Sequence, residues 1–231
     1  QGDRHERSDN VQSATLRQWN DHQAVKYIEL NCRIDSLRKT AKPLMIYDTP
    51  GPNNSQDTSH KDLLEKALSL PGEKLLVYVL NATQLATQDD KQLLQEIKNS
   101  PALAAGNQII FILNKVDQLD EERGETIEIF LEKTRKYLEG MGYLRPVIIP
   151  AMMQTSLIAK KVLSRKSITR NHKHRLQAEL ERLRENKFSV NEASYISLKL
   201  KRHVRAELQK SLPVNVTPDR FNKNEFKQIF D

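Results

Sequence analysis

Short apolar runs alternate with helix-like stretches along this chain. Four runs have the length of a buried strand and are bounded by polar or turn-forming residues: Leu44–Tyr47, Leu75–Leu80, Ile109–Leu113 and Val147–Ile149. Three stretches with apolar residues on one face predict helices: Asp62–Leu70, Gln88–Lys98 and Glu121–Glu139. This alternation predicts an α/β fold built on a mostly parallel, doubly wound sheet.

One strand of the predicted sheet is expected to run against its neighbour. Between Val25 and Asp35, apolar and polar residues alternate, as in a strand with one covered face. Only the short polar stretch Ser36–Lys42 joins it to the run Leu44–Tyr47. A link of that length cannot hold a crossover helix, so we expect an antiparallel pair.

Polar tetrads directly follow two of the predicted strands. The run Leu44–Tyr47 leads into Asp48–Gly51, and the run Ile109–Leu113 leads into Asn114–Asp117. Open α/β sheets bind their ligands at the carboxyl ends of their strands. The sequence therefore predicts that these two tetrads share one binding site.

The chemistry of the two tetrads differs. The Asp48 carboxylate can hold Mg²⁺ directly or through a water molecule, and the Gly51 amide can approach a terminal phosphate without Cβ interference. The Asp117 carboxylate can accept hydrogen bonds from the ring N1–H and the exocyclic amine of guanine together. Asn114 can brace this loop and reach the base edge, while the Lys115 stem can lie along the ring plane.

The two tetrads, in this order and separation, resemble the third and fourth motifs of a P-loop GTPase. The string Asp48–Asn53 resembles the dynamin-like large GTPases in particular, and the resemblance covers about residues 25–155. It implies a protein that binds GTP or GDP with Mg²⁺ and hydrolyses GTP, with Asp48 at the metal. It also implies self-association of two molecules across the nucleotide.

The resemblance extends weakly to the end of the last predicted strand. GTPases carry a small-residue motif there, whose backbone amide meets the guanine oxygen, and Ala151 is the residue that matches it. Pro150 and Met152 depart from the usual serine and lysine. Pro52 stands where many small GTPases carry a water-orienting glutamine, so the sequence identifies no catalytic residue.

A phosphate-binding loop of the form G-x-x-x-x-G-K-[ST] is missing from these 231 residues. That loop would supply the backbone amides and the lysine around the phosphates. A truncated GTPase and a degenerate one both fit this absence. We expect truncation before the loop, because the chain starts at Gln1 rather than methionine, and we expect the fragment alone to be inactive.

Charge is concentrated in one part of the chain. The net charge is +7, and residues 157–210 hold 15 Lys and Arg against 5 Asp and Glu. This segment is expected to form amphipathic helices with basic polar faces. A solvated face, an anionic membrane surface and nucleic acid are the alternatives, and the sparse aromatic residues argue against nucleic acid.

The cysteine content and the length of the apolar runs indicate the cellular compartment. Cys32 is the one cysteine, which excludes an intramolecular disulfide, and the longest apolar runs are five or six residues. We expect a cytoplasmic protein, peripheral at a membrane if the basic helices bind acidic lipid.

The sequence divides into a loop or frayed helix at 1–24, a partial GTPase domain at 25–156, a basic helical segment at 157–212 and a closing helix at 213–231. The competing hypothesis is a non-catalytic interaction module for acidic lipid or a protein partner, with a vestigial nucleotide site.

Overall fold

The fold was analysed in a computed structural model of the chain. The structure describes residues 11–22, 25, 28–31, 45–49, 69, 74–101, 108–185, 198–199, 202–203 and 206. The chain divides into two compact units, Gln1–Tyr47 and Asp48–Asp231. In the first unit, helix α1 spans Ser13–Asn20 and buries none of its residues. In the part of the chain that is described, no helix is long and apolar enough to cross a membrane.

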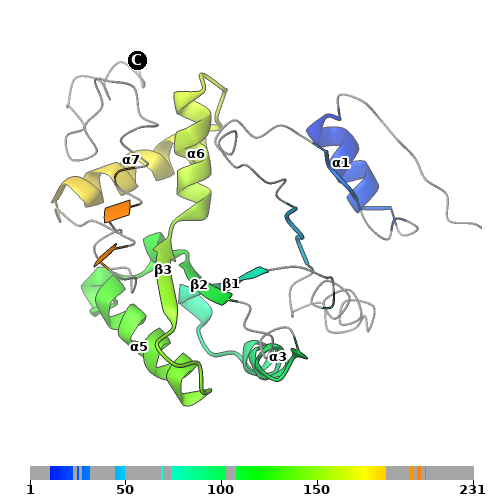
Figure 1. The fold of residues 1–231 in the computed structure, drawn as a ribbon. Coiled ribbons are helices and arrows are strands. Elements are labelled where there is room, and N and C mark those ends of the chain that lie inside the picture. Colours follow the sequence, from blue (N-terminus) through cyan, green and yellow to red (C-terminus); the bar gives the residue numbers. More distant parts are fainter. Residues whose placement is uncertain are drawn as a thin grey trace, which may run out of the picture. The chain divides into compact units, whose positions relative to one another are not determined.

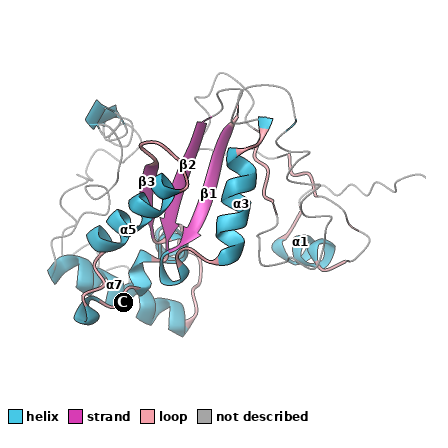
Figure 2. Ribbon diagram, turned by 90° about the horizontal axis from the view of Figure 1, so that it is seen from below, coloured by secondary structure: helices cyan, strands magenta, loops and turns pink. Residues whose placement is uncertain are grey.

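The second unit contains a parallel sheet of three strands (Figures 1 and 2). Strand β1 spans Leu75–Asn81, β2 spans Gln108–Asn114 and β3 spans Val147–Ala151, in the spatial order β1-β2-β3. Both neighbouring pairs are parallel. The predicted α/β class is therefore confirmed, and three of the four predicted apolar runs form strands.

The crossover helices α3, Gln88–Lys98, and α5, Ile127–Gly140, both lie on one face of the sheet (Figure 1). Right-handed crossovers between strands that follow each other in space place their helices on the same side. The core forms between this face and the two helices, and its fully buried members include Leu80, Leu94, Phe111, Leu113, Leu131, Leu138 and Ile148. It holds the carboxyl ends of the strands in place, which matters for the site.

The other face of β1 is apolar and exposed. Leu75, Val77 and Val79 are 56%, 53% and 49% exposed, although the sequence predicts a strand buried on both faces. Further across this face, Ile112 of β2 is 9% exposed, and Ile149 of β3 beside it is half-buried. A helical layer on the second face of a doubly wound sheet stays a prediction.

The predicted antiparallel pair is wrong in the residues that the structure describes. Residues 28–31 and 45–49 form no strand, and Met45, Ile46 and Tyr47 are 69%, 69% and 55% exposed. An apolar run becomes a strand only when a neighbour completes its backbone hydrogen bonds, and this run is short and bracketed by the prolines Pro43 and Pro50, which cannot donate to a ladder. The rest of this pair lies outside the described residues.

The predicted helix Glu121–Glu139 is interrupted near its start. A short 3-10 turn, η5, spans Glu121–Arg123, and Gly124 follows it with a φ of +75°. The chain restarts as α5 only after Thr126, whose side chain accepts a hydrogen bond from the Ile129 amide. A glycine in the left-handed region ends a helix, and a threonine cap begins one, so the two together divide the predicted helix.

Two helices follow β3. Helix α6 spans Met153–Leu163, and helix α7 spans Arg170–Glu185. The Thr169 hydroxyl accepts a hydrogen bond from the His172 amide at 3.3 Å and so caps the start of α7. The helix predicted at Asp62–Leu70 and the closing helix at 213–231 lie outside the described residues, apart from Ser69.

Candidate functional site

The carboxyl ends of the three strands lie side by side, and two of them carry an asparagine. Asn81 of β1 pairs in register with Asn114 of β2, and Asn114 pairs with Ala151 of β3. The Asn81 side chain accepts hydrogen bonds from the amide and the hydroxyl of Thr83, at 3.2 and 3.0 Å. The sheet therefore brings Asn114 and Ala151, two of the residues singled out by sequence, to the same edge.

The loop that leaves β2 turns sharply at Lys115. This residue adopts the left-handed conformation, with φ 66° and ψ 30°, and its side chain is exposed. The next residue, Val116, is fully buried and anchors the 3-10 turn η4, Val116–Gln118. The left-handed turn at Lys115 and the buried Val116 stand between Asn114 and Asp117. These two polar side chains therefore have different hydrogen-bond partners.

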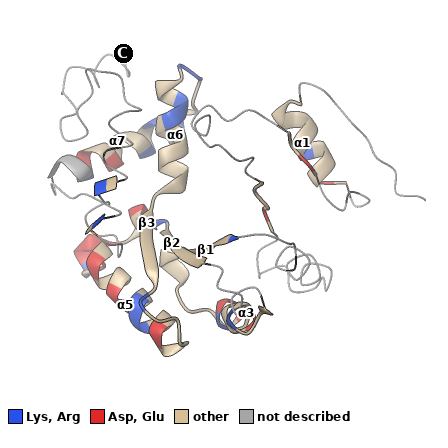
Figure 3. Cartoon of the chain, viewed as in Figure 1, with Lys and Arg blue, Asp and Glu red and all other residues tan. Residues whose placement is uncertain are grey.

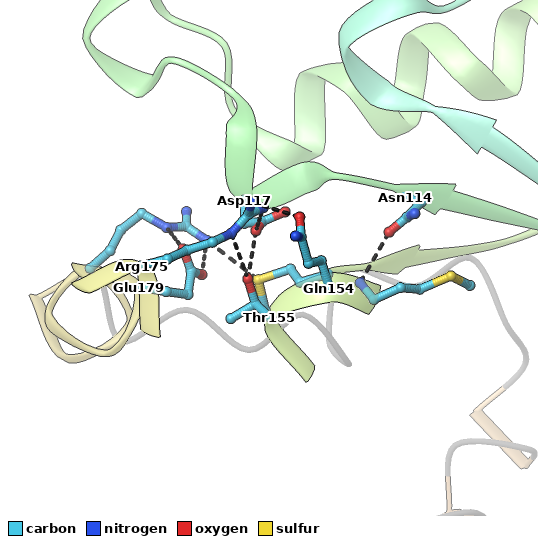
Figure 4. Close-up of polar contacts among 9 residues, drawn as sticks. Asn114, Asp117, Gln154, Thr155, Arg175 and Glu179 are labelled. Atoms are coloured by element: carbon cyan, nitrogen blue, oxygen red, sulfur yellow. Dashed lines mark hydrogen bonds and ion pairs between the residues drawn. The ribbon is translucent and has the colours of Figure 1, made fainter. Parts of the chain in front are cut away.

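Asn114 joins the loop to the start of α6. Its side-chain oxygen accepts a hydrogen bond from the Met153 amide at 3.0 Å (Figure 4). The first amides of a helix have no partner within the helix, so this bond satisfies one of them. The contact agrees with the bracing role predicted for Asn114, and it fixes the β3–α6 turn next to the β2 loop.

The Asp117 carboxylate is the centre of a polar cluster at the end of β2 (Figure 4). Its side chain is 5% exposed. One oxygen, Oδ2, accepts a hydrogen bond from the Thr155 hydroxyl at 2.7 Å and from Arg175 Nη2 at 2.8 Å. Arg175 also donates from Nη1 to Gln154 at 2.7 Å and from Nε to the Thr155 hydroxyl at 3.3 Å. Two helices thus supply donors to one carboxylate oxygen.

Sequence reasoning missed Thr155 and Arg175. Thr155 lies 38 residues from Asp117 along the chain, and Arg175 lies 58 residues away. Arg175 is one of the 15 basic residues of a segment expected to face solvent or an acidic surface. No local pattern distinguishes it from its neighbours, because its contact depends on how α6 and α7 fold back toward β2.

A cavity of about 320 Å³ adjoins this cluster. Its lining residues are Asp117, Gln118, Arg175, Ala178, Glu179 and Arg182. The volume is at the lower end of the range of about 300–1,000 Å³ that small-molecule sites occupy. The charged groups of the lining are paired with one another, Arg175 with Asp117 and Arg182 with Glu179.

A second ion pair holds α7 beside the same loop. Arg182 donates to Glu179 from Nη2 at 2.6 Å and from Nε at 3.1 Å, and it also pairs with Glu121 of η5. The hydrogen bond from Glu179 is the main cause that raises the pKa of Arg182, and burial of the guanidinium opposes it. Glu179 belongs to α7 itself and orients the Arg182 guanidinium, while the pair with Glu121 links α7 to η5 without involving Asp117.

The residues predicted for the phosphate end stay predictions. Asp48 is exposed, and the described residues before it, 45–47, form no strand, for the reason given for residues 45–49. Gly51 lies outside the described residues. In that described part, no group of three or more His, Cys, Asp or Glu side chains could hold a metal ion. Mg²⁺ takes one or two carboxylates together with substrate phosphates, so Asp48 alone fits it only as one ligand among several.

Comparison with known proteins finds a GTPase that is similar in sequence. The chain is similar to the tRNA modification GTPase MnmE of Desulforamulus reducens, with 28% identity over 170 residues, which cover 69% of this chain and 35% of MnmE. This similarity supports a relationship to the P-loop GTPases. No protein-family model matches the chain, and no solved structure matches it significantly.

The P-loop GTPase relationship gives the site a chemical interpretation. The Asn114–Asp117 loop and Ala151 lie at the sheet edge where a nucleotide base is expected, and their roles in binding stay predictions. The chain spans about a third of the length of the curated relative it matches, 35% by alignment. A complete activity therefore has to be proposed for the whole protein.

Proposed function

We propose that this chain belongs to a dynamin-like GTPase that binds GTP with Mg²⁺ and hydrolyses it, and that Asp117 reads the guanine base. The observation that carries the proposal is the buried carboxylate of Asp117 just after the carboxyl end of β2, whose donors Thr155 and Arg175 both contact the same oxygen, Oδ2. The similarity to a GTPase supports the same assignment.

Each of the other residues has a proposed role in holding the nucleotide. Asn114 braces the loop through the Met153 amide, the Lys115 stem lies along the base, and the Ala151 amide meets the guanine oxygen. Asp48 holds Mg²⁺ and Gly51 approaches the terminal phosphate. Bound Mg²⁺ would neutralise phosphate charge, and no catalytic residue for hydrolysis is assigned.

The proposal is tested by exchanging Asp117 for asparagine in the complete protein. The amide can keep its oxygen toward Thr155 and Arg175 while its nitrogen faces the base, where it offers a donor in place of an acceptor. Guanine then loses its partner, whereas xanthine gains one at its C2 oxygen. We expect GTP turnover to fall by about tenfold to a hundredfold, and xanthosine triphosphate to be preferred.

A matched control is Glu122→Gln, which makes the same acid-to-amide change at an exposed position of η5. It should leave the preference for guanine nucleotides unchanged. If Asp117→Asn also keeps the GTP selectivity of the wild type, the assignment of the base site fails.

A membrane surface is the proposed partner of the basic segment. Lysine and arginine positions, blue in Figure 3, lie on α6 and in the turn that follows it, where Lys160, Arg165 and Lys166 are exposed. Such clusters are attracted to anionic lipid. Liposomes with anionic lipid should bind the complete protein more tightly than neutral ones, with binding weakened by salt. Equal binding to both kinds of liposome would contradict this.

A further inference from the structure

Arg175 occupies a position on Asp117 that a guanine base also needs. A carboxylate oxygen has two lone pairs, and both lone pairs of Asp117 Oδ2 are used, one by the Thr155 hydroxyl and one by Arg175 Nη2. Guanine presents two donors, the ring N1–H and the exocyclic amine, which together call for both oxygens of the carboxylate. One of the two present donors must therefore leave Oδ2 when the base binds.

The two donors differ in how readily they can leave. Thr155 is 5% exposed and lies in the first turn of α6, so its hydroxyl has no other environment to move into. Arg175 has a long side chain that is 30% exposed, and it can turn toward solvent at the mouth of the cavity. Displacement of Arg175 is therefore the easier rearrangement.

The chemical likeness of the two ligands strengthens this conclusion. Guanine carries its donor nitrogens on one carbon, in the same N–C–N arrangement as a guanidinium group. Arg175 contacts Asp117 through one nitrogen of this planar group, Nη2, and two further acceptors hold the guanidinium there, Thr155 Oγ1 and Gln154 Oε1.

We propose that Arg175 is an internal competitor of guanine at Asp117, so that nucleotide binding displaces its guanidinium and loosens the first half of α7. The inference rests on the proposed function, since it needs Asp117 to read guanine. The second half of α7 stays attached, because Arg182 pairs with Glu121 of η5 and not with Asp117. A partner that binds Arg175 and draws it away from Asp117 raises the affinity for guanine. By linkage, guanine raises the affinity for that partner by the same factor.

The test measures binding of GDP and ADP to the complete protein by calorimetry. Arg175→Gln removes the competing charge and should lower the GDP dissociation constant about tenfold, the effect of one hydrogen bond to a charged group. Gln154→Ala removes only the second acceptor of Arg175, at an exposed position, and should lower this constant about threefold. If Arg175→Gln does not fold, Gln154→Ala carries the test.

Arg170→Gln is the matched control, because it removes the same charge from the start of α7 at an exposed residue that contacts His174 and not Asp117. It should leave GDP affinity within about twofold of the wild type, since a surface charge has little effect on a distant contact. Hydrogen exchange gives a second readout. GDP should speed amide exchange near residue 175 in the wild type and have no such effect in Arg175→Gln.

The outcomes distinguish failure of the competition by Arg175 from failure of the guanine site at Asp117. Tighter GDP binding in both Arg175→Gln and Gln154→Ala, with Arg170→Gln unchanged, supports the competition. Equal or weaker GDP binding in these two variants, while the wild type still prefers GDP to ADP, overturns the competition and leaves the base site intact. Absence of any preference for GDP in the wild type overturns the proposed function and the competition with it.

Discussion

The buried hydroxyl of Thr155 is expected to stabilise the fold through Asp117. Thr155→Val replaces this hydroxyl by a methyl group of nearly the same size, so it creates no cavity. It removes the hydrogen bond of 2.7 Å to a carboxylate that is 5% exposed, and with it the weaker bond of 3.3 Å that the hydroxyl accepts from Arg175 Nε. Hydrogen bonds to charged groups contribute about 1.5–3 kcal/mol when the partner stays buried. We therefore expect the free energy of unfolding to fall by about 2 kcal/mol, which lowers Tm by about 4–8 °C.

Urea denaturation of Thr155→Val and Thr155→Ser measures this contribution. Serine keeps the hydroxyl and loses one methyl group, which costs about 1 kcal/mol, so the serine variant should be the more stable of the two. In a protein that already carries Asp117→Ala, the acceptor is gone, and Thr155→Val should then cost less than about 1 kcal/mol. A valine variant as stable as the wild type would refute the reasoning, because valine would then profit from its greater hydrophobicity without any loss at Asp117.

Two further predictions concern the sheet core and the end of α5. Burial raises the pKa of Tyr143 to about 12, so folding favours its neutral form; the stability this confers is complete below pH 10 and is lost between pH 10 and 12. Tyr143→Phe should remove about 2 kcal/mol of that alkaline decline in urea titrations, and an unchanged decline would contradict it. Gly142 has a φ of +83°, so Gly142→Ala should destabilise the protein by about 1–2 kcal/mol. Gly140 is the last residue of α5, and nothing lies within 4 Å of a Cβ added there, so Gly140→Ala should be neutral or stabilising. Equal Tm values for the two alanine variants would contradict the strain argument.

The strands that the sequence predicted correctly are those whose neighbours are also in the sheet. The run Ile109–Leu113 became β2, which is paired on both sides and has three consecutive buried residues. The run Leu44–Tyr47 has a similar composition but no strand conformation at its described residues, 45–47. Hydrophobicity indicates that a segment can be buried, and only long-range pairing decides whether it is.

The candidate site was predictable only in part, for the same reason. Asn114 and Asp117 follow a strand directly, so their place at the sheet edge follows from local sequence. The partners of Asp117 do not, since α6 and α7 contribute Thr155 and Arg175 through tertiary packing. The sequence signal for Arg175, a net charge spread over 157–210, pointed to solvent or lipid and not to a buried carboxylate.

A buried carboxylate needs donors at all times, and this requirement limits how strongly Arg175 can oppose a nucleotide. At 5% exposure the Asp117 side chain has lost most of its hydration, so removing a donor without replacement would leave charge uncompensated. In the proposed exchange, guanine would bring two donors as Arg175 withdraws, and Thr155 would keep its bond to Asp117. Because the exchange replaces one fully hydrogen-bonded arrangement of Asp117 by another, only the free-energy difference between the two arrangements opposes nucleotide binding. This is why the expected effect of Arg175→Gln on GDP affinity is about tenfold, one charged hydrogen bond, rather than the much larger effect of stripping a buried ion pair.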